Sequence, residues 1–222
     1  MAVKKKVGQV KYIASGVDDS QRGSAGRVLR NKLVIVKMRE MEDAELEGYI
    51  DAEVALRKEI SAEHRFVNAD IDRIHELFLG KIYDWAGRYR DVNLTKGGFT
   101  FATARYIPQL MTNFEREVLS KHTPCVGKNV EEVARSVAVV HVEFLLIHPY
   151  REGNGRTARL LASLMAYQAG LPGLDFSFIG SRGKEFENYV AAIQAGVDNN
   201  YRPMTAIMKR AIDRALKNAH KT

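Results

Sequence analysis

The sequence predicts an all-α domain that carries one short β-hairpin. Apolar residues recur at helical spacing in most segments after residue 33. One segment, residues 92–101, instead alternates apolar and polar residues on either side of Gly97-Gly98, as in a hairpin with a tight turn. With 222 residues, 45% of them hydrophobic, the chain is long enough for one domain with a substantial core.

The expected helices follow in chain order. Residues 37–60 are rich in helix formers, and Gly48 within them marks either a break or a close backbone approach. Asn68 is expected to cap the next helix, over residues 69–83. After the hairpin we expect helices over residues 104–122, 129–147, 155–170, 184–200 and 203–219. The strongly apolar 129–147 segment belongs at the centre of the core, and Gly170 is typical of a helix C-terminus.

The first 32 residues differ in composition from the rest. They hold eight basic and two acidic residues, whereas the remaining 190 residues hold 26 and 25, so the net charge of +7 belongs mostly to this segment. We therefore predict a basic flexible arm over 1–32, usually a solvated tail. A helical segment over 33–64, the main domain over 65–210 and a helix end over 211–222 complete the division. The nearly neutral body does not favour nucleic-acid binding.

Neither a membrane span nor a secretory signal is expected. No stretch approaches about 18 to 20 uninterrupted apolar residues, and no apolar region follows the basic N-terminus. Cys125, the single cysteine, rules out an intramolecular disulfide and agrees with a cytoplasmic location.

Residues 148–159, His-Pro-Tyr-Arg-Glu-Gly-Asn-Gly-Arg-Thr-Ala-Arg, form a dense polar segment between two apolar runs. A helix that begins near Gly155 would offer its unpaired first-turn amides to an anion. Gly153 and Gly155 would let the backbone approach a phosphate. Arg156 and Arg159 share a helix face, so that both guanidinium groups can hold one polyphosphate chain.

Glu152 and His148 supply the remaining chemistry. Mg²⁺ commonly takes one or two protein carboxylates together with phosphate oxygens, which suits Glu152. His148 titrates near neutrality, which suits a general base. Each residue also has a simpler interpretation: His148 can cap the preceding helix, and Glu152 can pair with a solvated arginine. Their combination in one corner favours phosphate chemistry, because no structural role requires them all.

This segment resembles the signature of Fic-domain proteins, His-Pro-Phe-x-Asp/Glu-Gly-Asn-Gly-Arg-x-x-Arg, with Tyr150 in place of Phe. Residues 82–102, IYDWAGRYRDVNLTKGGFTFA, resemble the family segment that ends in the flap hairpin. Residues 188–204, NYVAAIQAGVDNNYRPM, resemble the region that closes the nucleotide pocket. The resemblance covers roughly residues 65–205 and is to toxin-type bacterial members.

The resemblance implies a Fic-type helical core with a β-hairpin flap, which transfers AMP from ATP to a Ser, Thr or Tyr hydroxyl of a target protein. His148 would deprotonate the hydroxyl and Glu152 would hold Mg²⁺. The nucleotide would be bound by Gly153, Asn154, Gly155, Arg156 and Arg159, with Tyr189 as a wall of the adenine pocket or else a core residue. The flap, which would pair with the target, comprises Asn93, Leu94, Thr95, Lys96, Gly97, Gly98 and Phe99.

Regulation is open at this point. Many members carry an inhibitory Ser/Thr-x-x-x-Glu-Gly/Asn helix, and Glu47-Gly48 resembles it with Asp43 at the hydroxyl position. The simpler interpretation is that Glu47 is one of several acids on an exposed helix, and a separate small antitoxin is the alternative inhibitor. Three functional alternatives stand beside AMP transfer: another nucleotide or phosphate donor, a binding module without activity, and nucleic-acid binding through the arm. In the related Doc kinases a lysine replaces the first of the two motif arginines and the second is missing. The presence of both Arg156 and Arg159 therefore favours nucleotidyl transfer over the phosphorylation that Doc kinases carry out.

Overall fold

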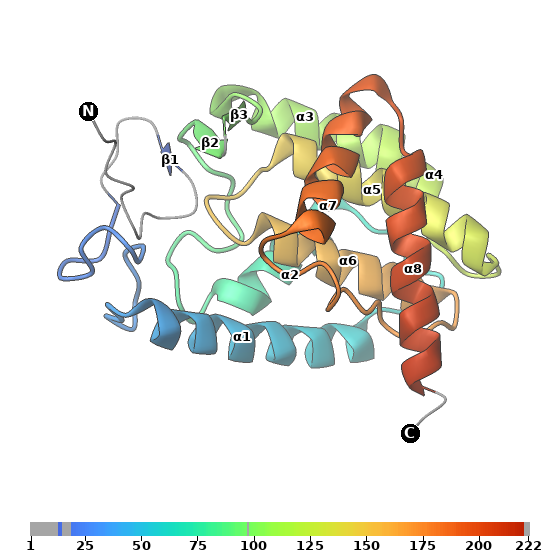
Figure 1. Cartoon of the computed structure of the whole chain (residues 1–222), viewed down its shortest axis with the longest axis horizontal. Helices are drawn as coiled ribbons and strands as arrows, with labels where there is room; N and C mark the ends of the chain where they lie inside the picture. The colour runs from blue at the N-terminus through green and yellow to red at the C-terminus, as the bar shows by residue number, and fades with distance from the viewer. Residues whose placement is uncertain (1–12, 15–18, 97, 220–222) are drawn as a thin grey trace.

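The computed structural model of the chain describes residues 13–14, 19–96 and 98–219, and these residues form a helical body with one small sheet (Figure 1). The fold is therefore all-α, as predicted. Its helices are α1 (Met38–Glu59), α2 (Asn68–Leu79), α3 (Ile107–Phe114), α4 (Ser120–His122), α5 (Val130–Ile147), α6 (Asn154–Gln168), α7 (Lys184–Gln194) and α8 (Arg202–Ala219). A π-helical stretch, Glu115–Leu119, joins α3 to α4.

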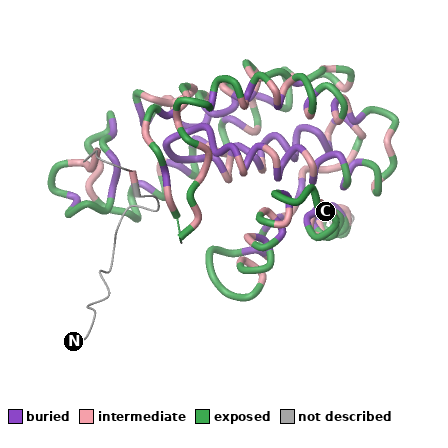
Figure 2. The backbone as a smooth tube through the Cα atoms, turned by 90° about the horizontal axis from the view of Figure 1, so that it is seen from above, coloured by how far each residue is buried: buried purple, intermediate pink, exposed green. Residues whose placement is uncertain are grey.

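Helix α5 lies at the centre of the core, as its apolar sequence predicts. Asn129 caps it by accepting a hydrogen bond from Glu132 N, and the Glu132 carboxylate in turn accepts one from Asn129 N. Helices α6 and α8 pack against α5, and buried residues concentrate along α5 and α6, in the middle of the molecule (Figure 2). The corner between α5 and α6, which carries the polar segment, is thus built on the most buried part of the fold.

Helix α1 crosses α2 at Gly48. A Cβ atom at this position would lie 2.3 Å from Phe78 O, so only glycine permits this helix contact. Gly48 therefore marks a close backbone approach, and α1 continues through it without a break. The contact places α1 beside α2 and α6.

The predicted cap at Asn68 is wrong. Val67 is the N-cap residue of α2, and Asp70 Oδ2 accepts the Val67 amide at 2.8 Å. Asn68 instead donates through Nδ2 to Met111 O at 2.9 Å, which ties α2 to α3. The side chain of Asn68 is thus used for a contact between two helices and not for capping its own helix.

The hairpin forms as predicted, with β2 (Leu94–Lys96) antiparallel to β3 (Phe99–Thr100). Gly97, between them, lies outside the described residues. An additional strand, β1 (Ile13–Ala14), pairs antiparallel with β2, with Ile13 opposite Thr95 and Ala14 opposite Leu94. The N-terminal segment thus occupies the outer edge of β2.

The prediction of a flexible arm over residues 1–32 is wrong for residues 19–32. Val28 and Leu29 are buried there, and Lys32 N donates to Ile82 O at 2.8 Å. Asp19 forms two hydrogen bonds with the guanidinium group of Arg151, at 2.6 and 2.9 Å. Apolar burial and an ion pair to the polar loop therefore hold this part of the segment against the body. Residues 1–12 and 15–18 lie outside the described residues.

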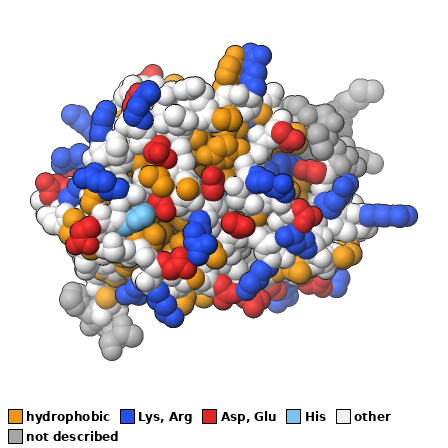
Figure 3. All heavy atoms as spheres, turned by 180° about the vertical axis from the view of Figure 1, so that it is seen from behind, with side chains coloured by type: hydrophobic (Ala, Val, Ile, Leu, Met, Phe, Trp, Pro, Cys, Tyr) orange, Lys and Arg blue, Asp and Glu red, His pale blue; other side chains and the backbone are white. Residues whose placement is uncertain are grey.

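None of the helices in the described part of the chain is long and apolar enough to cross a membrane. On the face seen in Figure 3, basic and acidic side chains are interspersed and no area of a single sign dominates.

Candidate active site

The polar segment forms the corner between α5 and α6. His148 follows α5 with φ 55° and ψ 59°, a left-handed conformation that is uncommon for a residue with a side chain. Gly153, with φ 84°, is the N-cap residue of α6, which begins at Asn154. The strain at His148 is of the kind that persists where the surrounding structure enforces it.

The ring of His148 is held from two sides. Its Nδ1 lies 3.1 Å from Leu145 O, and because a carbonyl oxygen only accepts, Nδ1 carries the proton. The ring of Phe101, at the end of the flap, stacks on the imidazole with centroids 3.8 Å apart. Burial lowers the pKa of His148 to about 3, so the imidazole is neutral at pH 7 and Nε2 has the lone pair that a base needs.

Arg90 connects the flap to this corner. Its Nε donates to His148 O at 2.8 Å, and its two terminal nitrogens donate to Val92 O and Ala102 O, both at 2.6 Å. Burial lowers the pKa of Arg90 to about 10, so it remains charged at neutral pH. One guanidinium group therefore fixes both ends of the flap and the carbonyl of the strained histidine.

Asn154 and Tyr150 brace the loop. Asn154 Oδ1 accepts the Tyr150 amide at 2.9 Å, and Asn154 Nδ2 donates to Tyr150 O at 2.8 Å. Asn154 is fully buried, so its side chain shapes the loop. The hydroxyl of Tyr150 donates to Asp72 Oδ1 at 2.6 Å, which gives the tyrosine a partner that phenylalanine would lack.

His75 on α2 supports the loop from the side of that helix. The Gly87 amide donates to His75 Nδ1 at 2.8 Å, so the proton sits on Nε2, which donates to Glu152 O at 3.0 Å. A Cβ atom at Gly153 would lie 2.7 Å from Leu79 Cδ1 and 3.2 Å from His75 Nε2. Position 153 therefore requires glycine for two reasons: its φ is positive, and a side chain there would clash with Leu79 and His75.

The first turn of α6 faces outward from the loop. Arg156 N and Thr157 N donate to Gly153 O, at 3.0 and 2.9 Å. Within the described chain the amides of Asn154 and Gly155 have no acceptor, as expected of a helix N-terminus. An added Cβ atom at Gly155 would meet nothing within 4 Å, so there is open space beside these amides. The arrangement suits an anion such as phosphate.

Arg156 lies between two carboxylates. Its Nη1 is 2.6 Å from Glu45 Oε2 on α1, and its Nη2 is 3.6 Å from Glu152 Oε1. Glu45 is buried and also accepts the Tyr83 hydroxyl at 2.8 Å. Glu152 Oε1 accepts the Gly153 amide at 2.9 Å. Helix α1 thus contributes directly to the site through Glu45.

The prediction that Glu47 restrains the site by pairing with Arg159 stays a prediction, and within the described part of the chain Glu47 forms no ion pair with Arg156 or Arg159. Glu47 is exposed and lines a shallow surface hollow with Asp43, Leu46, Ile50 and Asp51. Two residues along an α-helix turn the side chain by about 200°. Since Glu45 faces Arg156, Glu47 must face away from it.

Arg159 lies between two aromatic rings. Its Cζ is 5.4 Å from the Phe176 ring centroid and 5.6 Å from that of Tyr189. Its Nε is buried and has no hydrogen-bond partner among the described residues. Tyr189, predicted as an adenine wall or a core residue, is 5% exposed, and its hydroxyl lies 2.6 Å from Nε2 of the buried His141.

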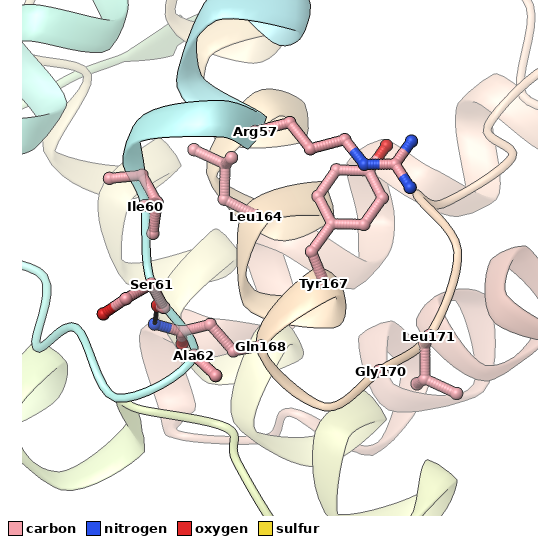
Figure 4. Close-up of a pocket in the computed structure, with 9 residues that line it drawn as sticks. All are labelled: Arg57, Ile60, Ser61, Ala62, Leu164, Tyr167, Gln168, Gly170 and Leu171. Carbon is pink, nitrogen blue, oxygen red and sulfur yellow. Dashed lines mark hydrogen bonds between the residues drawn. The ribbon is translucent and has the colours of Figure 1, made fainter.

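A separate cavity of about 270 Å³ lies at the other end of α6 (Figure 4). Its polar lining is used internally: Gln168 donates to His64 O at 2.7 Å, and Arg57 lies 4.5 Å from the Tyr167 ring. None of the predicted site residues lines it. The motif residues 148–159 therefore lie apart from this cavity.

The geometry defines a helical protein whose corner loop sets a neutral histidine beside an open helix N-terminus that suits an anion. Residues 65–166 match the model of the Fic/DOC family, so the chain carries a Fic/DOC family domain.

Named relatives agree with this family. The probable protein adenylyltransferase y4lH of Sinorhizobium fredii is 26% identical over 208 residues, which cover 91% of this chain and 100% of that protein. The probable protein adenylyltransferase Fic of Salmonella typhimurium is 28% identical, over 64% of this chain and 68% of that protein. The crystal structure of BepC from Bartonella tribocorum with bound AMPPNP has a TM-score of 0.66 and 23% identity, over 82% of this chain and 91% of that chain. This last likeness shows the shared fold.

Sequence reasoning missed Glu45, Arg90 and His141. Glu45 is one of several acidic residues in α1. Only the rotation of α1 about its axis, relative to α2, determines which of these side chains points into the protein. Arg90 stands among charged neighbours in an irregular segment. His141 falls within an apolar helix, and a polar residue in such a run is the one signal that pointed to a buried partner.

Proposed function

We propose that this chain is a protein adenylyltransferase, which transfers AMP from ATP to a Ser, Thr or Tyr hydroxyl of a target protein and releases pyrophosphate. The observation that carries the proposal is the neutral His148, with its proton on Nδ1, in the same loop as the open N-terminus of α6. The relatives named as probable protein adenylyltransferases support the same reaction.

In the proposed step, His148 Nε2 removes the proton of the target hydroxyl. The oxygen then attacks the α-phosphorus of ATP, the bond from that phosphorus to the bridging oxygen breaks, and pyrophosphate leaves with the bond electrons. Stacking on Phe101 and the Leu145 carbonyl keep the imidazole in one orientation. A base held in this way contributes typically 10²- to 10⁴-fold in rate.

The phosphates would lie over the first turn of α6. The amides of Asn154 and Gly155 face the open space there, and Arg156 and Arg159 supply positive charge on the same helix. AMPPNP is an ATP analogue, and its presence in BepC supports ATP as the nucleotide. We also propose a cytoplasmic location, where ATP is available.

The donor set fits Mg²⁺. The described residues hold no group of three or more His, Cys, Asp or Glu side chains that could bind a metal ion by themselves. Glu152 is a single carboxylate at the loop, so a cation there would complete its shell with phosphate oxygens and water, as Mg²⁺ commonly does. When bound, Mg²⁺ would neutralise phosphate charge.

The target would dock on the flap as an added strand. Since β1 occupies the outer edge of β2, the open edge in the described part of the sheet is that of β3. Phe101 N donates to Leu94 O at 3.1 Å, so the amide of the preceding Thr100 faces away from β2. Thr100 therefore offers its N–H and C=O to a target segment, next to the phenylalanine that stacks on His148.

Incubation of the full chain with a cell lysate and ATP labelled on either the α- or the γ-phosphate tests the proposal. Transfer of the α-label to protein is expected. Transfer of the γ-label alone would show a kinase instead, and transfer of neither label would favour a binding module.

A further inference from the structure

A directional hydrogen-bond chain runs behind Arg159. His141 on α5 is 2% exposed, with Nδ1 3.2 Å from Ala158 O and Nε2 2.6 Å from the Tyr189 hydroxyl. A carbonyl oxygen only accepts, so Nδ1 holds the proton and donates it to Ala158. Nε2 of the neutral ring is then an acceptor, and the Tyr189 hydroxyl must donate to it. The tautomer is thus fixed by the residue that precedes Arg159.

The same histidine holds both aromatic rings that flank Arg159. Its ring stacks on Phe176, with centroids 6.2 Å apart and planes 17° from parallel, and it makes an edge contact with Tyr189 at 5.8 Å. Because the hydroxyl of Tyr189 is tethered to His141, its ring is held in place, with the ring centroid 5.6 Å from Arg159 Cζ. The arginine therefore lies between two rings that both contact His141.

The charge state of His141 agrees with a hydrogen bond in which the Tyr189 hydroxyl donates to the neutral ring. Burial lowers its pKa to about 3, and the positive charge of Arg159 acts in the same sense. The imidazole therefore stays neutral at physiological pH and places no second positive charge behind Arg159.

We infer that His141 is a positioning residue that acts through Tyr189 to hold the Arg159 guanidinium where it contacts the terminal phosphate of ATP. The inference rests on the proposed function, which assigns Arg159 to the phosphates. It predicts that His141 affects the binding of a triphosphate and leaves the binding of AMP unchanged, because AMP lacks the phosphates that Arg159 would reach.

Two substitutions separate this role from plain core packing. In His141→Asn the side-chain amide can replace Nδ1 and keep the bond to Ala158 O, but it cannot reach Tyr189. In His141→Gln the longer side chain places its terminal group near Nε2 and can accept from the Tyr189 hydroxyl. Tyr189→Phe removes that hydroxyl and keeps the ring, which provides a further variant with little change in volume.

The test is the calorimetric affinity of these variants for AMPPNP and for AMP. His141→Asn and Tyr189→Phe should weaken AMPPNP binding by about five-fold or more, with AMP binding unchanged, and His141→Gln should restore AMPPNP binding. In an Arg159→Ala background, His141→Asn should add almost no further loss.

Three results would overturn the inference. These are equal loss of AMP and AMPPNP binding in His141→Asn, independent effects of His141→Asn and Arg159→Ala, or unchanged AMPPNP binding in both His141→Asn and Tyr189→Phe. If the wild-type chain binds neither nucleotide, the proposed function itself fails, and the positioning role fails with it.

Discussion

Replacing Glu45 by Gln should destabilise the protein, whereas the same change at Glu47 should not. Glu45 is 5% exposed, and its carboxylate oxygens lie 2.6 Å from Arg156 Nη1 and 2.8 Å from the Tyr83 hydroxyl. Glu47 lies two residues further along the same helix and is exposed. The pair of variants thus compares an identical chemical change on opposite faces of α1.

The size of the effect follows from the burial of the ion pair. Removing one partner of a fully buried pair costs about 3–5 kcal/mol. The Arg156 side chain is 27% exposed, and Glu152 stays 3.6 Å away, so water and a second carboxylate compensate part of the loss. Glutamine also keeps an acceptor for Tyr83. We therefore expect a loss of about 2 kcal/mol for Glu45→Gln and less than about 0.5 kcal/mol for Glu47→Gln.

Thermal unfolding followed by circular dichroism measures this difference. For a domain of this size, 1 kcal/mol corresponds to about 2–4 °C, so Glu45→Gln should lower Tm by about 4–8 °C. Glu47→Gln should unfold with the wild type. An equal shift in both variants, or a shift only in Glu47→Gln, would refute the assignment of Glu45 to Arg156.

The loop, the flap and the buried histidines each allow a further test. Gly155→Ala should keep the Tm of the wild type, because nothing lies within 4 Å of the new methyl group, but should weaken AMPPNP binding by about ten-fold or more in calorimetry. Wild-type affinity would place the phosphates elsewhere, and Gly153→Ala, which clashes with Leu79, should instead lose stability. Thr100→Pro removes an amide that faces away from β2, so it should abolish target modification while nucleotide binding persists; undiminished modification would exclude the β3 edge as the docking site. Burial lowers the pKa values of three histidines, to about 4 for His75 and about 3 for His141 and His148, so the unfolded state binds more protons below pH 6.5. The free energy of unfolding should therefore fall from pH 7 to pH 5, by at most about 1.4 kcal/mol per pH unit per histidine, and Tm should fall with it; a Tm that is flat over this range would contradict their neutral burial.

Local patterns in the sequence are sufficient for the helices and the corner loop. The pattern predicts a helix over residues 37–60, and α1 spans Met38–Glu59, because its helix formers and apolar spacing act within single turns. The predicted helix start near Gly155 lies at Asn154 in α6, because glycines beside a polar loop mark a helix terminus.

Contacts between distant segments could not be predicted in this way. The pairing of β1 with β2 joins Ile13 to Thr95, and the Asp19–Arg151 ion pair spans 132 positions. Neither leaves a periodic signal, and a segment rich in glycine and basic residues is typical of a tail. Which of Glu45 and Glu47 faces Arg156 depends on the rotation of α1 about its axis. The close contact of Gly48 with Phe78 sets this rotation.

The central claim is that His148 is the base in AMP transfer, and the most direct measurement compares pyrophosphate release with incorporation of α-labelled AMP into protein. The wild-type chain should release one pyrophosphate for each AMP that protein gains, and His148→Ala should lower both by about 10²-fold or more while AMPPNP affinity stays unchanged. Full incorporation of label by His148→Ala, or label transfer without matching pyrophosphate release, would contradict the account.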